Sequence, residues 1–154
     1  MVLPINLYTD GASRGNPGPG GYGVVLKCGE HYKEISAGYE CTTNNRMELL
    51  AVIVGLEAIK RENAQVNVYS DSTYVVKAVT EGWLVKWQQK GLGKQKNADL
   101  WERFLQVYKK HQIRFFWIKG HDGHPENERC DKLAVQAATS ATLLKDIGYE
   151  NVIK

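Results

Sequence analysis

The order of the strand-like segments constrains the fold of this chain more than any other feature of its sequence. Three segments with the alternation and the β-branched or aromatic content of strands (2–8, 22–27 and 32–38) come first, with no helix between them. Helical segments then alternate with two further strands, over 66–70 and 113–118. Hairpins followed by β–α alternation predict an α/β protein with a mixed sheet and helices on its faces, not a parallel barrel.

Cap residues and apolar periodicity locate the helices. Cap-forming residues at 42–45 precede a long apolar segment, which predicts a helix to about residue 59. Residues 11–21 contain five glycines and two prolines, so they are predicted to form a loop. Because the chain has neither a repeat nor a linker, we expect one domain over 1–154, with a core of about 2–138 and an irregular tail over 139–154. The other predicted helices are 72–80, 83–96 (a basic helix with a loop), 98–110 and 126–138.

Composition excludes several classes of protein. The 154 residues are 43% hydrophobic and 24% charged, which rules out disordered, collagen-like and low-complexity chains. The first residues include no basic region, and no stretch is apolar for long enough to span a bilayer. Cys28, Cys41 and Cys130 are widely spaced and are expected to be reduced thiols. We therefore expect a soluble, cytoplasmic monomer that does not bind membranes.

Positive charge is concentrated in one part of the chain. From Lys77 to Lys119 there are ten basic and three acidic residues, a net charge of +7, whereas the whole chain carries +3. The remainder therefore carries −4. A basic segment beside an acidic remainder indicates that one part holds a polyanion while carboxylates act in the other. A solvated helix face would explain the basic segment equally well.

Four acidic residues lie where acids are structurally unusual. Asp10 and Asp71 each follow an apolar strand-like segment, Glu48 interrupts an otherwise apolar helix, and Asp131 begins the apolar part of the last predicted helix. Ligand sites in open α/β sheets gather at the carboxyl ends of strands. Clustered carboxylates repel one another unless a cation compensates, and hard oxygen ligands suit Mg²⁺ or Mn²⁺. Two such ions roughly 4 Å apart would clamp the attacking and leaving oxygens of a phosphodiester.

Each of these acids also has an ordinary structural explanation when it is taken alone. Asp10 precedes a glycine and suits a turn, Asp71 precedes a serine and suits a helix N-cap, and Asp131 suits the start of its helix. Only Glu48 lacks such an explanation. The metal site is therefore inferred from the four residues as a set.

Two histidines lie in a glycine-flanked segment before the last predicted helix. His121 could move protons near neutral pH, whereas His124 precedes a proline and is expected to have a structural role. A zinc site would combine both histidines with Cys130, but a fourth ligand at matching spacing is missing.

Two sets of residues have the chemistry of nucleic-acid contacts. Trp83 and Trp87 are four residues apart and are interleaved with Lys86 and Lys90, which suits stacking on sugars or bases beside phosphate contacts. Residues 43–45 offer hydroxyl and amide groups at a predicted helix N-terminus, a natural position for a phosphate. A tryptophan pair in the core and simple helix capping are the respective alternatives.

Five stretches of the chain resemble type 1 ribonuclease H (bacterial ribonuclease HI). They are 8–12, 16–23, 42–49, 70–75 and 117–131, and they occur in the order of the family. The resemblance covers residues 6–138. It implies the ribonuclease H-like fold, in which a five-stranded mixed sheet of three antiparallel strands followed by two parallel ones has helices on both faces.

The resemblance also implies a function. The family consists of endonucleases that cut the RNA strand of RNA/DNA hybrids, such as primers and R-loops, and leave 5′-phosphate and 3′-hydroxyl ends. By resemblance, Asp10, Glu48, Asp71 and Asp131 would hold two Mg²⁺ ions, with Mn²⁺ as a possible substitute, and His121 would assist proton movement or product release. Glu48 would also contact a 2′-hydroxyl, and Thr43 would lie in a pocket for a phosphate of the DNA strand. The implied substrate-binding residues are Ser13, Asn16, Thr43, Asn44, Asn45, Arg46, Trp83, Lys86, Trp87 and Lys90.

The sequence departs from the family pattern in the basic protrusion after Trp83. The protrusion is short, and Leu92 and Gly93 stand where another tryptophan and more lysines are expected. Fewer phosphate contacts would weaken binding to the hybrid. Two alternative functions are a related nuclease that acts on other duplexes and a catalytically inactive nucleic-acid-binding module.

Overall fold

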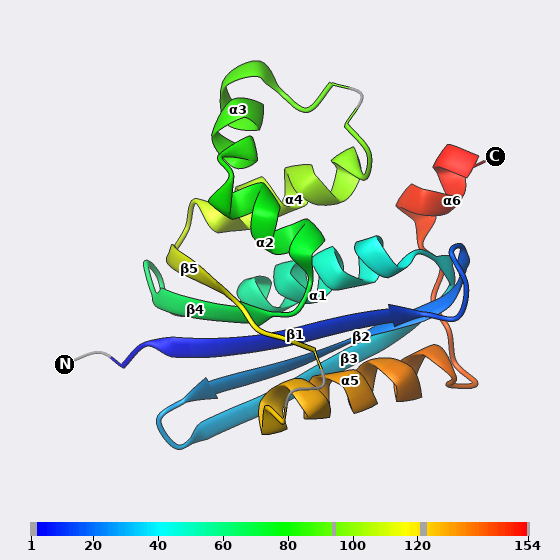
Figure 1. The fold of residues 1–154 in the computed structure, drawn as a ribbon, viewed down its shortest axis with the longest axis horizontal. Helices are drawn as coiled ribbons and strands as arrows, with labels where there is room; N and C mark the ends of the chain where they lie inside the picture. Colours follow the sequence, from blue (N-terminus) through cyan, green and yellow to red (C-terminus); the bar gives the residue numbers. More distant parts are fainter. Residues whose placement is uncertain (1–2, 94, 121–122, 154) are drawn as a thin grey trace.

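The computed structural model of the chain describes residues 3–93, 95–120 and 123–153. Five strands form one sheet in the order β3-β2-β1-β4-β5 (Figure 1). The first three pair antiparallel, and β4 pairs parallel with both β1 and β5, so the expected five-stranded mixed sheet is confirmed. The strands are β1 (Ile5–Ser13), β2 (Gly18–Cys28), β3 (His31–Thr42), β4 (Gln65–Ser70) and β5 (Gln112–Trp117).

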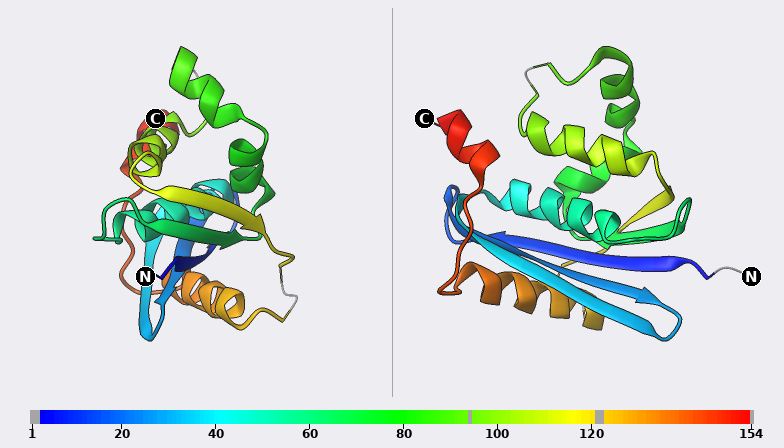
Figure 2. Two further views of the ribbon diagram at one scale, coloured as in Figure 1. Left: turned by 90° about the vertical axis from the view of Figure 1, so that its left-hand side faces the viewer. Right: turned by 180° about the vertical axis from the view of Figure 1, so that it is seen from behind.

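Helices cover both faces of the sheet, as expected. α1 packs on β1 and β2, and α4 packs on α1 as an outer layer, while α5 covers the opposite face of β1, β2 and β3 (Figures 1 and 2). α3 packs on α2 and stands away from the sheet. The helices are α1 (Asn44–Glu57), α2 (Thr73–Thr80), α3 (Trp83–Lys90), α4 (Ala98–Tyr108), α5 (Pro125–Ala138) and α6 (Ile147–Ile153).

The core lies between the sheet and these helices, and strand alternation divides it. Leu7 of β1 is fully buried in the large cluster on the α1 side, together with residues such as Leu49 and Trp101. The next residue, Tyr8, packs on the α5 side against the smaller cluster that contains Cys130. β1 is therefore covered on both faces at these residues. Among the described residues, no helix is long and apolar enough to cross a membrane.

The glycine-rich segment 11–21 is mainly strand, so the prediction of a loop there is wrong. β1 continues to Ser13 and β2 begins at Gly18. The reason is tertiary, because a Cβ at Gly21 would lie 2.6 Å from the carbonyl oxygen of Ala134 in α5. Glycine is typical of turns in isolation, but here it lets a helix approach the sheet closely.

The tail after residue 138 is more regular than expected, which corrects the prediction of an irregular 139–154. Leu144 pairs with Tyr39 of β3 in an isolated parallel bridge, and α6 follows it. The backbone N–H of Leu144 donates to Gly38 O, and that of Glu40 donates to Leu144 O, each at 2.8 Å. These bonds use the free edge of β3 and bring α6 beside the N-terminal end of α1 (Figure 1).

The close packing of α5 on the sheet gives a stability prediction. Gly21→Ala would force the new Cβ against the backbone of α5, so we expect the free energy of unfolding to fall by about 1–3 kcal/mol, as for an overpacked core. Urea unfolding followed by circular dichroism measures this change. The exposed Ser36→Ala in β3 is the control and should change stability by less than about 0.5 kcal/mol. Equal stabilities of the two variants would contradict the packing argument.

Candidate active site

Three carboxylates meet where β1 parts from β4. Asp10 lies within β1, not after it as predicted, because the strand continues to Ser13. Asp10, Glu48 and Asp71 each offer an oxygen atom, and these atoms all lie within 4.8 Å of one another. In the described part of the chain, this is the only group of three or more acidic, histidine or cysteine side chains with metal-ligand spacing. The zinc site considered from the sequence includes His121, which lies outside the described residues.

Strand pairing brings the two aspartates together. β1 and β4 are parallel neighbours, with Tyr8 opposite Tyr69, and each aspartate follows two residues after this pair. Both therefore emerge at the same edge of the sheet, where α/β proteins place their ligand sites.

Glu48 reaches the same point because α1 approaches β1 very closely. A Cβ at Gly11 would overlap the backbone of Met47 and Glu48, so only glycine allows this approach. The N–H of Gly11 donates to Asp10 Oδ1 at 2.9 Å, which orients the carboxylate.

The environment of these acids disfavours negative charge. Asp10 is 6% exposed and Glu48 is 5% exposed. Burial and the charges of Asp71 and Asp131 raise the pKa of Asp10 to about 7. Burial and the charge of Asp10 likewise raise the pKa of Glu48 well above its ordinary value.

The same residues fit a divalent cation. Glu48 Oε2 is buried and has no hydrogen-bond partner among the described residues. A buried carboxylate oxygen without a donor, beside two further acids, is stabilised when a cation supplies the missing positive charge. Three hard oxygen donors match the preference of Mg²⁺ or Mn²⁺.

Two more residues have expected catalytic roles, and the structure describes only one of them, Asp131. Asp131 on α5 is partly exposed and lies outside the group of three, but its charge contributes to the raised pKa of Asp10. His121 lies outside the described residues. His124 is the N-cap residue of α5, but its side chain is exposed and forms no capping hydrogen bond, so the structural role expected for it stays a prediction.

A second feature is a polar cavity of about 410 Å³ at the N-terminal end of α1, which we call the N-terminal pocket. Four of the expected substrate-binding residues line it: Asn16, Thr43, Asn44 and Asn45. Three further residues line it that were not predicted to do so: Lys96, Asn97 and Tyr149. Lys96 belongs to the basic segment that was predicted to hold a polyanion. No local pattern marks Asn97 or Tyr149, because they come from the start of α4 and from α6.

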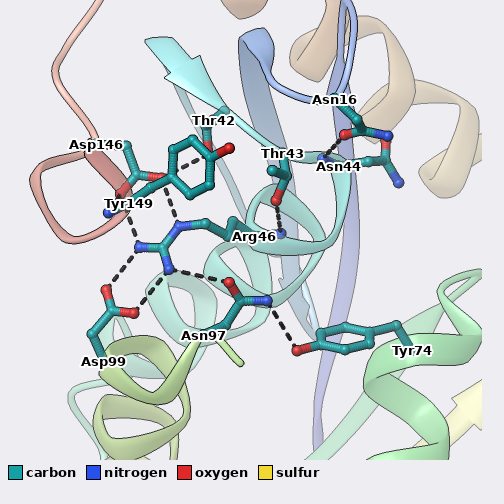
Figure 3. Close-up of polar contacts among 10 residues, drawn as sticks. All are labelled: Asn16, Thr42, Thr43, Asn44, Arg46, Tyr74, Asn97, Asp99, Asp146 and Tyr149. Carbon is teal, nitrogen blue, oxygen red and sulfur yellow. Dashed lines mark hydrogen bonds and ion pairs between the residues drawn. The ribbon is translucent and has the colours of Figure 1, made fainter. Parts of the chain in front are cut away.

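Hydrogen bonds organise the pocket. Thr43 Oγ1 caps α1 by accepting from the N–H of Arg46 at 3.3 Å, so the capping interpretation is confirmed for this residue. Asn16 Oδ1 accepts from the N–H of Asn44 at 2.8 Å (Figure 3) and from the hydroxyl of Ser13 at 3.0 Å. Ser13 therefore helps to orient the side chain of Asn16. Asn16 in turn connects the β1–β2 turn to the start of α1.

The expectation that Arg46 contacts substrate is wrong. Its side chain is 2% exposed and forms ion pairs with Asp99 and Asp146 (Figure 3). A buried guanidinium whose N–H groups already donate to two carboxylates cannot reach a phosphate.

The tryptophan pair divides between surface and core. Trp83 is 44% exposed, beside the exposed Lys86 and Lys90 on α3. Trp87 is 9% exposed and its ring centroid lies 4.9 Å from that of Trp101. Trp87 is therefore a core residue, because its ring packs in the hydrophobic cluster. The expectation that it contacts substrate directly is wrong.

Comparisons with known proteins agree with this arrangement. The family model for RNase H matches residues 4–139. The ribonuclease H of Desulforamulus reducens is 57% identical over 148 residues, which cover 93% of this chain and 92% of that protein. The chain belongs to the ribonuclease H family. The resemblance seen in the five sequence motifs is thereby confirmed, and so is the expectation of an enzyme.

Solved structures of ribonucleases H have the same fold. The crystal structure of LC9-RNase H1, described as a type 1 RNase H with the type 2 active-site motif, superposes with a TM-score of 0.80 at 33% identity, over 99% of this chain and 81% of that one. LC11-RNase H1, solved in complex with an RNA/DNA hybrid, gives a TM-score of 0.64 at 31% identity, over 87% of this chain and 96% of that one.

The buried carboxylates predict that the free energy of unfolding of the metal-free protein depends on pH. An acid whose pKa is higher in the folded chain binds its proton more tightly there, so the fold loses stability as the pH rises from about 4 through about 7. Asp10→Asn removes this cost. In excess chelator at pH 8, we expect this variant to be more stable than the wild type by roughly 2–4 kcal/mol, and at pH 4 by far less.

Urea unfolding of both proteins at the two pH values measures this difference. Glu102→Gln on α4 changes an exposed acid and should leave stability within about 0.5 kcal/mol at either pH. If Asp10→Asn raised the free energy of unfolding equally at pH 4 and pH 8, the electrostatic explanation would be contradicted.

Proposed function

We propose that this protein is an endonuclease that hydrolyses the RNA strand of RNA/DNA hybrids and leaves 5′-phosphate and 3′-hydroxyl ends. Two Mg²⁺ ions, or Mn²⁺ as a substitute, would be held by Asp10, Glu48, Asp71 and Asp131. The observation that carries the proposal is the convergence of three carboxylates, one of them with a buried oxygen that lacks a donor. Such a site is unfavourable in itself and becomes favourable with divalent cations.

Each acid has a distinct part in the proposal. Bound cations would polarise the scissile phosphate and neutralise the charge that develops during hydrolysis. Asp10 and Asp71 would hold them from the sheet edge and Asp131 from α5. Glu48 would in addition accept a hydrogen bond from a 2′-hydroxyl, the group that distinguishes RNA from DNA. Water attacks the phosphorus and the 3′-oxygen leaves, with His121 assisting proton movement or product release.

The basic part of the chain would bind the hybrid. The N-terminal pocket offers amides, a hydroxyl and an ammonium group, which suits a phosphate of the DNA strand. Trp83, Lys86 and Lys90 would extend this contact along the same strand from the exposed face of α3. The related LC11-RNase H1, whose structure contains an RNA/DNA hybrid, supports this class of substrate.

The proposal extends to the cellular setting. We infer that the enzyme acts as a monomer in the cytoplasm on primers and R-loops. Its three cysteines are all free thiols, which suits a reducing compartment.

An end-labelled RNA/DNA hybrid tests the proposed activity. We expect Mg²⁺-dependent cutting of the RNA strand, no cutting of matched RNA/RNA and DNA/DNA duplexes, and no cutting in excess chelator. Analysis of the fragment ends should give 5′-phosphates and 3′-hydroxyls. Cutting of another duplex would favour a related nuclease, and binding without any cutting would favour an inactive module.

Substitution of one carboxylate tests the site. Asp10→Asn should lower kcat at least about 100-fold, because an amide is a poor ligand for a hard cation and the phosphate loses its polarisation. Circular dichroism should show an unchanged fold. Glu102→Gln, the exposed control, should keep kcat within about twofold. Near-normal kcat in folded Asp10→Asn would refute the metal-binding role of this residue.

A further inference from the structure

Arg46 lies at the centre of a buried polar network that joins three distant parts of the chain. Its Nε donates to Asp146 Oδ2 at 2.8 Å and its Nη2 donates to Asp146 Oδ1 at 2.9 Å. The same guanidinium donates to both oxygens of Asp99, at 2.7 and 2.8 Å, and to Asn97 Oδ1 at 3.3 Å (Figure 3). The start of α1 is thereby fixed to the loop before α4 and to the segment that leads into α6.

The network orients Asn97, which lines the N-terminal pocket. The backbone of Asn97 is left-handed, with φ of 61°, a conformation that non-glycine residues rarely adopt. Its side chain is held on both sides, because Arg46 donates to its Oδ1 and its Nδ2 donates to the hydroxyl of Tyr74 at 3.1 Å. Strained residues persist where their surroundings over-determine them, and this is often at binding sites.

The same network holds α6 against the pocket. Asp146 is 7% exposed and also accepts from the hydroxyl of Thr42 at 2.6 Å. The N–H of Tyr149 donates to Asp146 Oδ1 at 3.4 Å, which caps the start of α6. The ring of Tyr149 lies over the Arg46 guanidinium, 5.8 Å from ring centroid to Cζ, and also lines the pocket. One wall of the pocket thus comes from the C-terminal end of the chain.

We propose that Tyr149 is a substrate-contacting residue of the N-terminal pocket and that Arg46 is a positioning residue that holds Asn97 and Tyr149 at it. This inference rests on the proposed function, in which the pocket receives a phosphate of the DNA strand. The segment Asp146–Tyr149 then sets the affinity for the hybrid, whereas hydrolysis takes place at the carboxylates. Loss of the segment should weaken binding and leave the chemical step intact.

Binding and turnover of one labelled hybrid test this inference. Fluorescence anisotropy in excess chelator gives Kd, and cleavage in Mg²⁺ gives KM and kcat. We expect Tyr149→Ala to raise Kd and KM about three- to tenfold, the equivalent of about one hydrogen bond, with kcat within about twofold. Arg46→Lys should have a similar effect, because a single ammonium group cannot hold two carboxylates and an amide at once.

Two further variants on the same helix separate the proposed contact from packing. Tyr149→Phe keeps the ring over Arg46 but removes the hydroxyl, so Kd should rise as it does in Tyr149→Ala. Ile147→Ala removes a side chain that is 66% exposed and does not line the pocket, so Kd and KM should not change. All measurements are made well below the melting temperature of each variant, and Tyr149→Ala suffices if Arg46→Lys does not fold.

Replacing single phosphates of the substrate shows which phosphate the N-terminal pocket binds. A series of hybrids carries one uncharged methylphosphonate at successive positions of the DNA strand. The wild type should lose affinity at the position that occupies the pocket, and Tyr149→Ala should lose little more there, since both changes remove the same contact.

The outcomes separate the two proposals. Unchanged Kd and KM in folded Tyr149→Ala would overturn the inference, as would a fall in kcat with KM unaltered. Full additivity of Tyr149→Ala with every methylphosphonate would also overturn it. A wild type that binds the hybrid without cutting it would refute the proposed catalytic function, while the Kd series would still decide the role of Tyr149 and Arg46.

Discussion

The close contact between β1 and the start of α1 is the constraint on which the site depends. At Gly11 the strand and the helix touch through their backbones, so Glu48 comes beside Asp10 in the second half of β1. The parallel pairing of β1 with β4 adds Asp71. The result is a buried concentration of negative charge that costs stability in the free protein, since burial raises the pKa of both Asp10 and Glu48. A bound divalent cation, as proposed, would offset that cost.

The start of α1 serves two sites at once. One face of its first turns carries Glu48 to the carboxylates, and its N-terminal end lines the polar pocket with Thr43 and Asn44. Because both lie on one short helical segment, the proposed phosphate contact and the proposed chemistry share a rigid support. Arg46, between them in sequence, uses its whole guanidinium to attach this segment to α4 and to the segment before α6.

Sequence reasoning located the fold and the acids but was wrong where packing overrides local preference. Glycines at 11–21 are typical of a loop, yet the helices α1 and α5 need them for close approach within strands. A cationic side chain next to a proposed phosphate site suggests a contact with the ligand. Arg46 instead forms ion pairs with Asp99 and Asp146 inside the protein. The tail looked irregular because its hydrogen-bond partners lie on β3, about a hundred residues earlier in the chain.

The sequence by itself determined the order of strands and helices and, through five motifs, the family and the identity of the acids. These features are local, because alternation, capping and motif spacing are written in neighbouring residues. Only the tertiary structure decided that Trp87 is core, that Arg46 is buried, and that Lys96, Asn97 and Tyr149 line one pocket with Asn16. Those outcomes depend on which distant segments pack together, and this is set by burial and ion pairing across the whole fold.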